Sequence, residues 1–262
     1  MTESISDQQE RRQFLIQYLL QEDAQYEAIT VPPTEAEQKR LLRALLNVRP
    51  PRPADAAFLR VQDAYLTQAA REKGIVQPAD FAPVQPGIFL WRGDITRLAA
   101  DAIVNAANSG MTGCYVPNHS CIDNCIHTYA GVQLRLACAQ HMRAQGHEEP
   151  PGRALLTPGF NLPARFVLHT VGPIVDGAVT EKDEALLAAC YRACLTLAQA
   201  HHLRSVAFCC ISTGVFHFPH RRAAEIAVQT VREFFAAHPQ EIGVLFNVFT
   251  EEDDAIYRAL LR

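Results

Sequence analysis

Residues 205–220 read SVAFCCISTGVFHFPH, and the character of the chain changes in the middle of this stretch. Ser205–Ile211 is an almost unbroken apolar run, which is typical of a strand that helices cover on both faces. A turn of small residues, Ser212–Gly214, follows it, and a helical pattern begins at His220. A strand that leads through a short turn into a helix is the repeating unit of α/β domains. The stretch therefore predicts a layered α/β fold.

The same alternation extends over residues 86–262. The strands that we expect are Gly87–Trp91, Ala102–Asn105, Ala154–Thr157, Phe166–Thr170, Ser205–Ile211 and Val244–Phe249. The helices that we expect are Asn124–Arg143, Glu181–Ala200, His220–Ala236 and Glu252–Leu261. This order predicts a three-layer α/β/α domain. In such domains ligands bind beyond the carboxyl ends of the strands, so the segments that follow the strands form the candidate site.

Residues 1–85 have a different pattern. Their apolar side chains recur at helical spacing, as in Leu41, Leu42 and Leu45, and proline-rich segments separate the helical stretches. This part of the chain has no strand pattern, repeat or chemical motif. We expect a helical extension that packs on the main domain, and a separate partner-binding module is the alternative.

Composition limits the possible partners. The chain has 262 residues and a net charge of −4, whereas binding to the phosphate backbone of nucleic acids needs clustered positive charge. No apolar stretch has the length of a transmembrane helix, and the polar start MTESISDQQERR does not resemble a signal peptide. Eight cysteines in such a chain indicate a reducing compartment rather than disulfides. We expect a cytoplasmic protein with neither nucleic-acid nor membrane partners.

Two of the segments after strands carry amide or carboxyl side chains. Asp94 lies in Gly93–Thr96, where its carboxylate can accept a hydrogen bond from an exocyclic amine or cap the next turn. Asn105 and Asn108 follow at the end of the next strand, with two alanines between them. An amide donates and accepts at once, which suits ribose hydroxyl groups, although asparagine is also a common turn residue. Ligand contact and turn formation both remain open.

The third segment has the spacing of a metal site. Cys114, His119 and Cys121 form Cys-x4-His-x-Cys in one short loop. Thiolate and imidazole are typical ligands of Zn²⁺, and three protein ligands with an open fourth position are typical of catalytic zinc. Cys125 stays open as a fourth ligand, and an incidental cluster is the alternative. Three residues of similar chemistry are interpreted as core residues instead: His169, Cys209 and Cys210.

The fourth segment, Ser212–Phe216, follows the most apolar strand and precedes a helix. Small residues and Gly214 allow successive backbone N–H groups to point at a phosphate, to which the next helix adds its positive end. The ring of Phe216 can cover a ribose or a base. All four segments are expected at the same edge of one sheet.

Together these segments resemble the macrodomain family, and within it the zinc-containing subfamily of bacterial and fungal ADP-ribosyl hydrolases. The motifs that match are Gly93–Thr96, Val104–Asn108, Gly113–Asn124, His169–Pro173 and Ser212–Phe216. The Cys-His-Cys loop is the mark of the subfamily. The resemblance implies a macrodomain with a mixed central sheet over residues 86–262 and an N-terminal helical extension over residues 1–85.

The resemblance also implies roles for the motif residues. Asp94 and the backbone of Ile95 would bind adenine, and Asn105 and Asn108 would line the distal ribose. The diphosphate would lie on Ser212, Thr213, Gly214, Val215 and Phe216. The metal ligands of Zn²⁺ would be Cys114, His119 and Cys121. The ligand contacts at the next helix would be Ile122, Asp123 and Asn124, and the catalytic residues would be Asp123 and Asn108.

The implied activity is removal of mono-ADP-ribose from modified proteins, with Asp123 as a base or an orienting group. Attack on the distal ribose C1″ and attack on an ester carbonyl attached to that ribose both remain open. A non-catalytic ADP-ribose-binding module and an O-acetyl-ADP-ribose deacetylase are the alternatives. Members of the subfamily are often linked with a lipoyl-carrier protein that a sirtuin-like transferase modifies, so such a carrier is an expected partner.

Two positions depart from the family pattern. His217 stands where many macrodomains have glycine, which leaves the width of the diphosphate site open. Asn124 follows Asp123 where a glycine is common outside the subfamily. A helix that begins there would turn the Asp123 carboxylate in a different direction.

Overall fold

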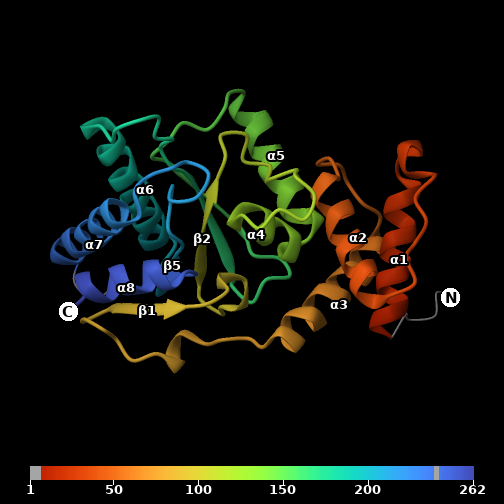
Figure 1. Ribbon diagram of the computed structural model, residues 1–262, viewed down its shortest axis with the longest axis horizontal. Helices are drawn as coiled ribbons and strands as arrows, with labels where there is room; N and C mark the ends of the chain where they lie inside the picture. Colours follow the sequence, from red (N-terminus) through yellow and green to blue (C-terminus); the bar gives the residue numbers. More distant parts are fainter. Residues whose placement is uncertain (1–6, 239–241) are drawn as a thin grey trace.

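The computed structural model describes residues 7–238 and 242–262. Figure 1 shows a body that contains a sheet and, beside it, a group of helices formed by the first part of the chain. The polar start at residues 1–6 lies outside the described residues. Within the described ranges, no helix has both the length and the apolar character needed to cross a membrane.

Among the described residues, one six-stranded sheet forms the centre of the body. Its strands are β1 (Ile88–Arg92), β2 (Ala102–Ala107), β3 (Ala154–Pro158), β4 (Phe166–Val171), β5 (Ser205–Phe208) and β6 (Gly243–Val248). They lie in the order β1-β6-β5-β2-β4-β3, and every neighbouring pair is parallel except β3 and β4. The sheet is therefore mixed, and the carboxyl ends of its parallel strands meet at one edge.

Helices cover both faces of this sheet. On one side in Figure 1 lie α4 (Ile122–Ala130) and α5 (Val132–Gln145), and on the other lie α6 (Glu181–Ala200), α7 (His220–Ala237) and α8 (Glu251–Leu260). Ile103 and Val104, on opposite faces of β2, have no exposed surface, which explains why this strand is apolar on both sides. The expected three-layer α/β/α architecture is confirmed.

Two expected elements differ from the structure. The helix expected at Asn124–Arg143 is divided into α4 and α5, because Gly131 between them has a φ angle of +93°. A Cβ atom at this glycine would lie 2.7 Å from Nε2 of Gln62, so the break is also a point of close packing. The strand expected to reach Ile211 ends at Phe208, and the residues after it belong to the following turn. The other elements agree with expectation to within two residues at each end.

The N-terminal helices have an apolar core of their own. They are α1 (Gln8–Gln21), α2 (Glu35–Val48) and α3 (Ala56–Lys73). They pack around Leu15, Ile16 and Phe58, whose side chains have no exposed surface. Short 3₁₀ turns occur at η1 (Ala24–Tyr26), η2 (Pro78–Asp80) and η3 (Ile95–Arg97).

Arg135 of α5 connects these helices to the body through hydrogen bonds. Its Nη1 donates hydrogen bonds to the backbone carbonyls of Asn47 and Arg49, each at 2.6 Å. The last carbonyls of a helix lack partners within the helix, so this buried guanidinium satisfies the end of α2. Asn47 also donates a hydrogen bond to Oγ1 of Thr128 in α4, at 2.8 Å. The helical extension therefore packs on the body, as expected.

Candidate active site

A cleft of about 530 Å³ lies beyond the carboxyl ends of β1, β2, β5 and β6. All four of the segments identified in the sequence reach it. Their lining residues are Gly93, Asp94, Ile95, Ala106, Ser120, Cys121, Ile122, Ser212, Thr213, Gly214, Val215 and Phe216. Segments that are far apart in the chain meet here because parallel strands end at the same edge of the sheet.

Cys114, His119 and Cys121 come together beside this cleft. Their sulfur and imidazole nitrogen atoms lie within 4.8 Å of one another, and Sγ of Cys114 is 3.5 Å from Nδ1 of His119. Positive φ angles at Gly113 (+85°) and Asn118 (+56°) turn the loop so that the three donors converge. Two thiols and one imidazole at these distances fit a single Zn²⁺ ion.

Cys121 also caps α4, and its Sγ accepts a hydrogen bond from the backbone N–H of Asn124 at 3.4 Å. The positive end of the helix favours a negatively charged sulfur. Burial, together with the Cys114 thiol, acts in the opposite direction and raises the pKa of Cys121 to about 12. A divalent cation offsets that penalty, because its charge stabilises thiolates. Cys125 is not among the donors that lie within 4.8 Å of one another, and its Sγ accepts a hydrogen bond from Nη2 of Arg43 at 3.5 Å.

The Asp123 carboxylate points inward from the first turn of α4 and is 5% exposed. Its Oδ1 accepts a hydrogen bond from Nδ2 of Asn105 at 2.8 Å, and its Oδ2 accepts one from Nδ2 of Asn108 at 3.1 Å. Burial raises the pKa of Asp123 to about 6, although both amides act to lower it. A carboxyl group with such a pKa can take up and release a proton near neutral pH.

A buried histidine supports Asn105 from the neighbouring strand. Nδ1 of His169 lies 3.1 Å from Nδ2 of Asn105, and its Nε2 lies 2.9 Å from Oγ1 of Thr157. Burial lowers the pKa of His169 to about 3, so the ring is neutral and can accept from the amide. His127, Cys138 and His169 form a second cluster of possible metal donors that sequence reasoning did not identify. Both nitrogens of His169 have protein partners, so we interpret His169 as a polar core residue that holds Asn105. The buried ring nitrogens of His127 make no hydrogen bond with a described residue, and its Nε2 lies 3.5 Å from Oδ1 of Asp123.

Asn105 and Asn124 have fully buried side chains, and neither lines the cleft. Asn108 and Asp123 lie directly behind the lining residues and are not part of the lining either. Nδ2 of Asn124 donates hydrogen bonds to the backbone carbonyls of Cys114, at 3.3 Å, and Val116, at 3.0 Å. We expected Asn105 and Asn124 to contact the ligand directly. Their side chains instead lie beneath the cleft wall, where Asn105 supports Asp123 and Asn124 supports the metal loop.

Asp94 both caps a turn and lines the cleft. Its Oδ1 accepts a hydrogen bond from the N–H of Thr96 at 3.0 Å, and its Oδ2 lies 2.5 Å from Nζ of Lys73. Burial alone would raise the pKa of Asp94, but the interactions with Lys73 and Thr96 outweigh burial and lower it. The carboxylate is therefore ionised and can accept a hydrogen bond from a ligand.

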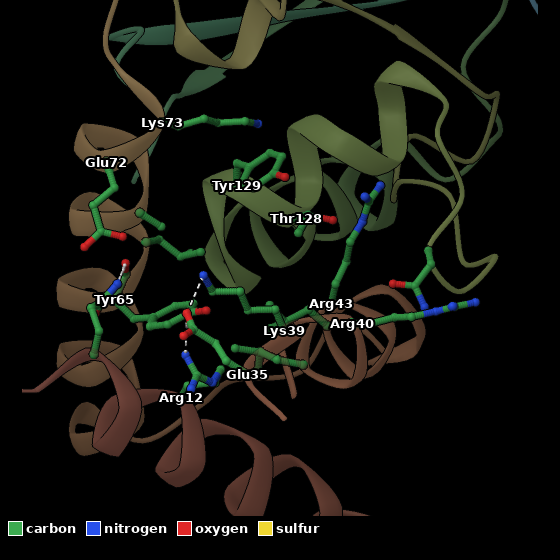
Figure 2. A pocket seen from close by; sticks show the side chains of 16 residues that line it. Arg12, Glu35, Lys39, Arg40, Arg43, Tyr65, Glu72, Lys73, Thr128 and Tyr129 are labelled. Atoms are coloured by element: carbon green, nitrogen blue, oxygen red, sulfur yellow. Dashed lines mark hydrogen bonds and ion pairs between the residues drawn. The ribbon is translucent and has the colours of Figure 1, made fainter. Parts of the chain in front are cut away.

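Two cations of the cleft wall come from the N-terminal helices and were not predicted. Lys73 ends α3, and its Nζ lies 4.0 Å from the centre of the Tyr129 ring (Figure 2). Arg43 of α2 donates through Nη2 to the backbone carbonyl of His119 at 2.6 Å. They were missed because residue spacing along the chain does not predict contacts between distant parts of the sequence. Phe249, a 77% exposed ring on the cleft wall, was also missed because it was assigned to the strand that it follows.

Ser212–Phe216 joins β5 to the segment before α7 and leaves backbone donors open. Within the described residues, the N–H groups of Gly214, Val215 and Phe216 make no backbone–backbone hydrogen bond. The N–H of His217 closes the turn onto the carbonyl of Gly214 at 3.0 Å. Open N–H groups in a glycine-containing turn ahead of a helix attract phosphate oxygens.

Two backbone positions hold this turn in shape. Ser212 has a φ angle of +66°, and a Cβ atom at Gly172 would lie 2.0 Å from the Oγ of Ser212. A side chain at position 172 would therefore force the side chains of Ser212 and Ile211 to shift. His217 has a φ angle of +58°, a conformation that glycine adopts without strain. The departure at His217 changes the side chain but keeps a glycine-like backbone.

Known proteins share this organisation. The Macro domain family profile matches residues 104–227. The chain is 56% identical to a protein-ADP-ribose hydrolase of Treponema medium, over 97% of this chain and 99% of that protein. It is 45% identical to a protein of the same name from Staphylococcus aureus (strain MSSA476), over 98% of this chain and 97% of that protein.

A solved structure extends the comparison to three dimensions. The Trypanosoma brucei macrodomain in complex with ADP-ribose is 32% identical to this chain, with a TM-score of 0.65. The match covers 84% of this chain and 95% of that one. Because these relatives match nearly the full length of the chain, the similarity includes helices of the extension as well as the sheet. The chain therefore belongs to the macro domain family.

Proposed function

We propose that this chain is a zinc-dependent hydrolase that removes mono-ADP-ribose from modified proteins. The observation that carries the proposal is the position of Cys114, His119 and Cys121 around one point beside the cleft. The relatives named protein-ADP-ribose hydrolase and the macrodomain structure with ADP-ribose support the reaction class and the ligand. The three-donor cluster supports zinc dependence, because three protein ligands are typical of catalytic zinc sites.

The ligand would lie along the cleft with its adenine at Asp94 and Ile95. The ionised Asp94 would accept a hydrogen bond from the adenine amino group. The open N–H groups of Ser212–Phe216 would hold the diphosphate. The distal ribose would then reach the metal loop, close to Asn108 and Asp123.

Hydrolysis requires a base for water and a proton for the leaving group. Cys114, His119 and Cys121 would hold the zinc, which would supply a Lewis acid to an oxygen of the distal ribose or of its ester. Asp123 takes a proton from water as the water oxygen bonds to C1″ or to the ester carbonyl. The bond to the protein side chain breaks, and the proton moves from Asp123 to the leaving oxygen. Asn105 and Asn108 hold the carboxylate in place through their amide hydrogen bonds.

Metal analysis and turnover of the same preparations test this proposal. We expect one zinc per chain in the natural protein, and release of ADP-ribose from carboxylate- or serine-linked protein substrates. Cys114→Ala should lose both metal and activity, whereas the matched Cys125→Ala should keep its metal because Cys125 lies outside the cluster. Full turnover by a metal-free Cys114→Ala protein would contradict zinc dependence.

The same assays separate the alternatives. Tight ADP-ribose binding without release from any modified protein would indicate a binding module. Cleavage of O-acetyl-ADP-ribose without cleavage of protein linkages would indicate a deacetylase. A lipoyl-carrier protein modified by a sirtuin-like transferase is the substrate that we propose to test first. We also propose a cytoplasmic location, because the metal loop needs reduced thiols at Cys114 and Cys121.

A further inference from the structure

A second cavity lies between the N-terminal helices and α4, with a volume of about 750 Å³ (Figure 2). Residues of α1, α2, α3 and α4 line it, together with Asn118 of the metal loop. Neither the family comparison nor the proposed chemistry assigns it a role. We call it the extension pocket.

The lining of the extension pocket has more basic than acidic side chains, although one of the basic ones, Lys73, is paired with Asp94 of the cleft. Its charged lining residues are Arg12, Lys39, Arg40, Arg43 and Lys73, together with the carboxylates Glu35 and Glu72. The pocket lining has an excess of positive charge, whereas the whole chain has a net charge of −4. A concave site lined by one sign of charge concentrates ligands of the opposite sign.

Not all of these cations are neutralised inside the protein. Glu35 pairs with Lys39 at 2.6 Å and lies 3.5 Å from Arg12, so it is shared between two cations. Arg40 is exposed and forms no ion pair with any described residue, and it points away from Glu35 in Figure 2. Arg43 likewise has no carboxylate partner among the described residues, and its buried Nε lacks a hydrogen-bond partner.

The extension pocket shares walls with the ADP-ribose cleft. Arg43, Lys73 and Tyr129 line both cavities. Arg43 also contacts the carbonyl of His119, a residue of the metal cluster. Lys73 lies beside Asp94, at the proposed adenine end of the cleft, whereas Arg43 lies at the metal loop. A protein attached to a distal ribose at the metal loop would therefore lie near the part of the shared wall that Arg43 forms.

We propose that the extension pocket binds acidic side chains next to the modified residue of the protein substrate. This inference rests on the proposed function, since it concerns the protein part of that substrate. Carboxylates fit better than a second nucleotide, because the pocket offers no free aromatic face for a base. Tyr65 is 7% exposed, and the Tyr129 ring is covered by the ammonium group of Lys73.

Two ADP-ribosylated peptides test the proposal. They carry the same linkage, with Asp and Glu flanking the modified residue in one and Ser and Gly in the other. We expect the natural protein to bind the acidic peptide more tightly, with Kd and KM about tenfold lower, and kcat to be nearly equal. This preference should shrink as salt is added, because the charges are partly exposed.

Arg40→Glu should abolish the preference while leaving the Kd for free ADP-ribose unchanged, since Arg40 does not line the cleft. Arg192→Glu is the matched control. It makes the same change in net charge at an exposed position on α6, on the other side of the sheet (Figure 1). The control should keep the natural preference.

Equal Kd values for the two peptides with the natural protein would overturn the proposal, even if both peptides were hydrolysed. An equal loss of free ADP-ribose binding in Arg40→Glu would also overturn it, because the pocket would then serve the nucleotide. If neither peptide is hydrolysed, the proposed function fails, and the ratio of the two Kd values still decides the role of the pocket.

Discussion

Replacing Asp123 with Asn should remove the pH dependence of hydrolysis near pH 6. Burial raises the pKa of this carboxyl group to about 6, against the opposing effect of the hydrogen bonds from Asn105 and Asn108. A general base works only in its ionised form. The rate should therefore rise with pH through a midpoint near this pKa and then level off.

The size of the effect follows from the titration. With a pKa of about 6, roughly nine tenths of Asp123 is ionised at pH 7 and roughly one tenth at pH 5. The kcat of the natural protein should therefore be about tenfold lower at pH 5 than at pH 7. Asp123→Asn keeps the size of the side chain but cannot ionise, so kcat should fall by about a hundredfold to ten-thousandfold.

The same pKa has a consequence for stability. Because the folded state raises the pKa of Asp123 above its ordinary value, the folded protein binds more protons than the unfolded chain between about pH 4 and pH 6. The free energy of unfolding should therefore decrease as the pH rises through that window. Asp123→Asn should lose this contribution, which urea unfolding at several pH values can measure.

The assay is release of ADP-ribose from a modified protein between about pH 5 and pH 8, with the zinc content measured at every pH. Metal analysis is needed because thiolate and imidazole ligands take up protons in acid and release their metal. If the residual activity of Asp123→Asn keeps a midpoint near pH 6 at constant zinc content, a different group titrates and the role of Asp123 is wrong.

Three other substitutions test the surroundings of the cleft. Lys73→Ala should lower the free energy of unfolding, measured in urea, by no more than about 1 kcal/mol, because the side chains of Lys73 and Asp94 are 36% and 28% exposed and solvent weakens their ion pair. A loss of several kcal/mol would show that the pair is structural. Gly172→Ala should weaken ADP-ribose binding, measured by calorimetry, and destabilise the protein by about 1–3 kcal/mol, since the new Cβ would lie 2.0 Å from Oγ of Ser212. Unchanged affinity would refute the close approach of Gly172 to Ser212. His217→Gly should change ADP-ribose affinity by less than about twofold and stability by less than about 1 kcal/mol, because the backbone of His217 already has a φ angle of +58°. A large loss of affinity would show that the imidazole contacts ADP-ribose directly.

Most of the fold could be predicted because its signals are local. The apolar run Ser205–Ile211 and the alternation of strands and helices identified the layers, and Thr34 begins α2 with the cap that its side chain favours. The break at Gly131 was missed because a glycine within a helical pattern is often tolerated. The early end of β5 was missed because Cys209–Ile211 stays apolar in the turn, where it is mostly buried.

In the candidate site, too, the features that depend on local sequence could be predicted and those that depend on distant contacts could not. Cys114, His119 and Cys121 lie within one loop, so their spacing alone predicted that they would meet. The burial of Asn105 depends on His169 from another strand, and the Lys73–Asp94 pair joins the extension to the body. Interactions of this kind depend on tertiary packing, which spacing along the chain does not encode. They place Asn105, which we expected at the ligand, behind Asp123, and they add Lys73 to the wall of the cleft.

X-ray absorption at the zinc edge, with and without ADP-ribose, tests the metal site most directly. Two sulfur neighbours at about 2.3 Å and one imidazole nitrogen at about 2.0 Å are expected, with one light-atom neighbour that changes when ADP-ribose binds. A zinc shell closed by four protein ligands, unaltered by ADP-ribose, would contradict a catalytic metal held by Cys114, His119 and Cys121.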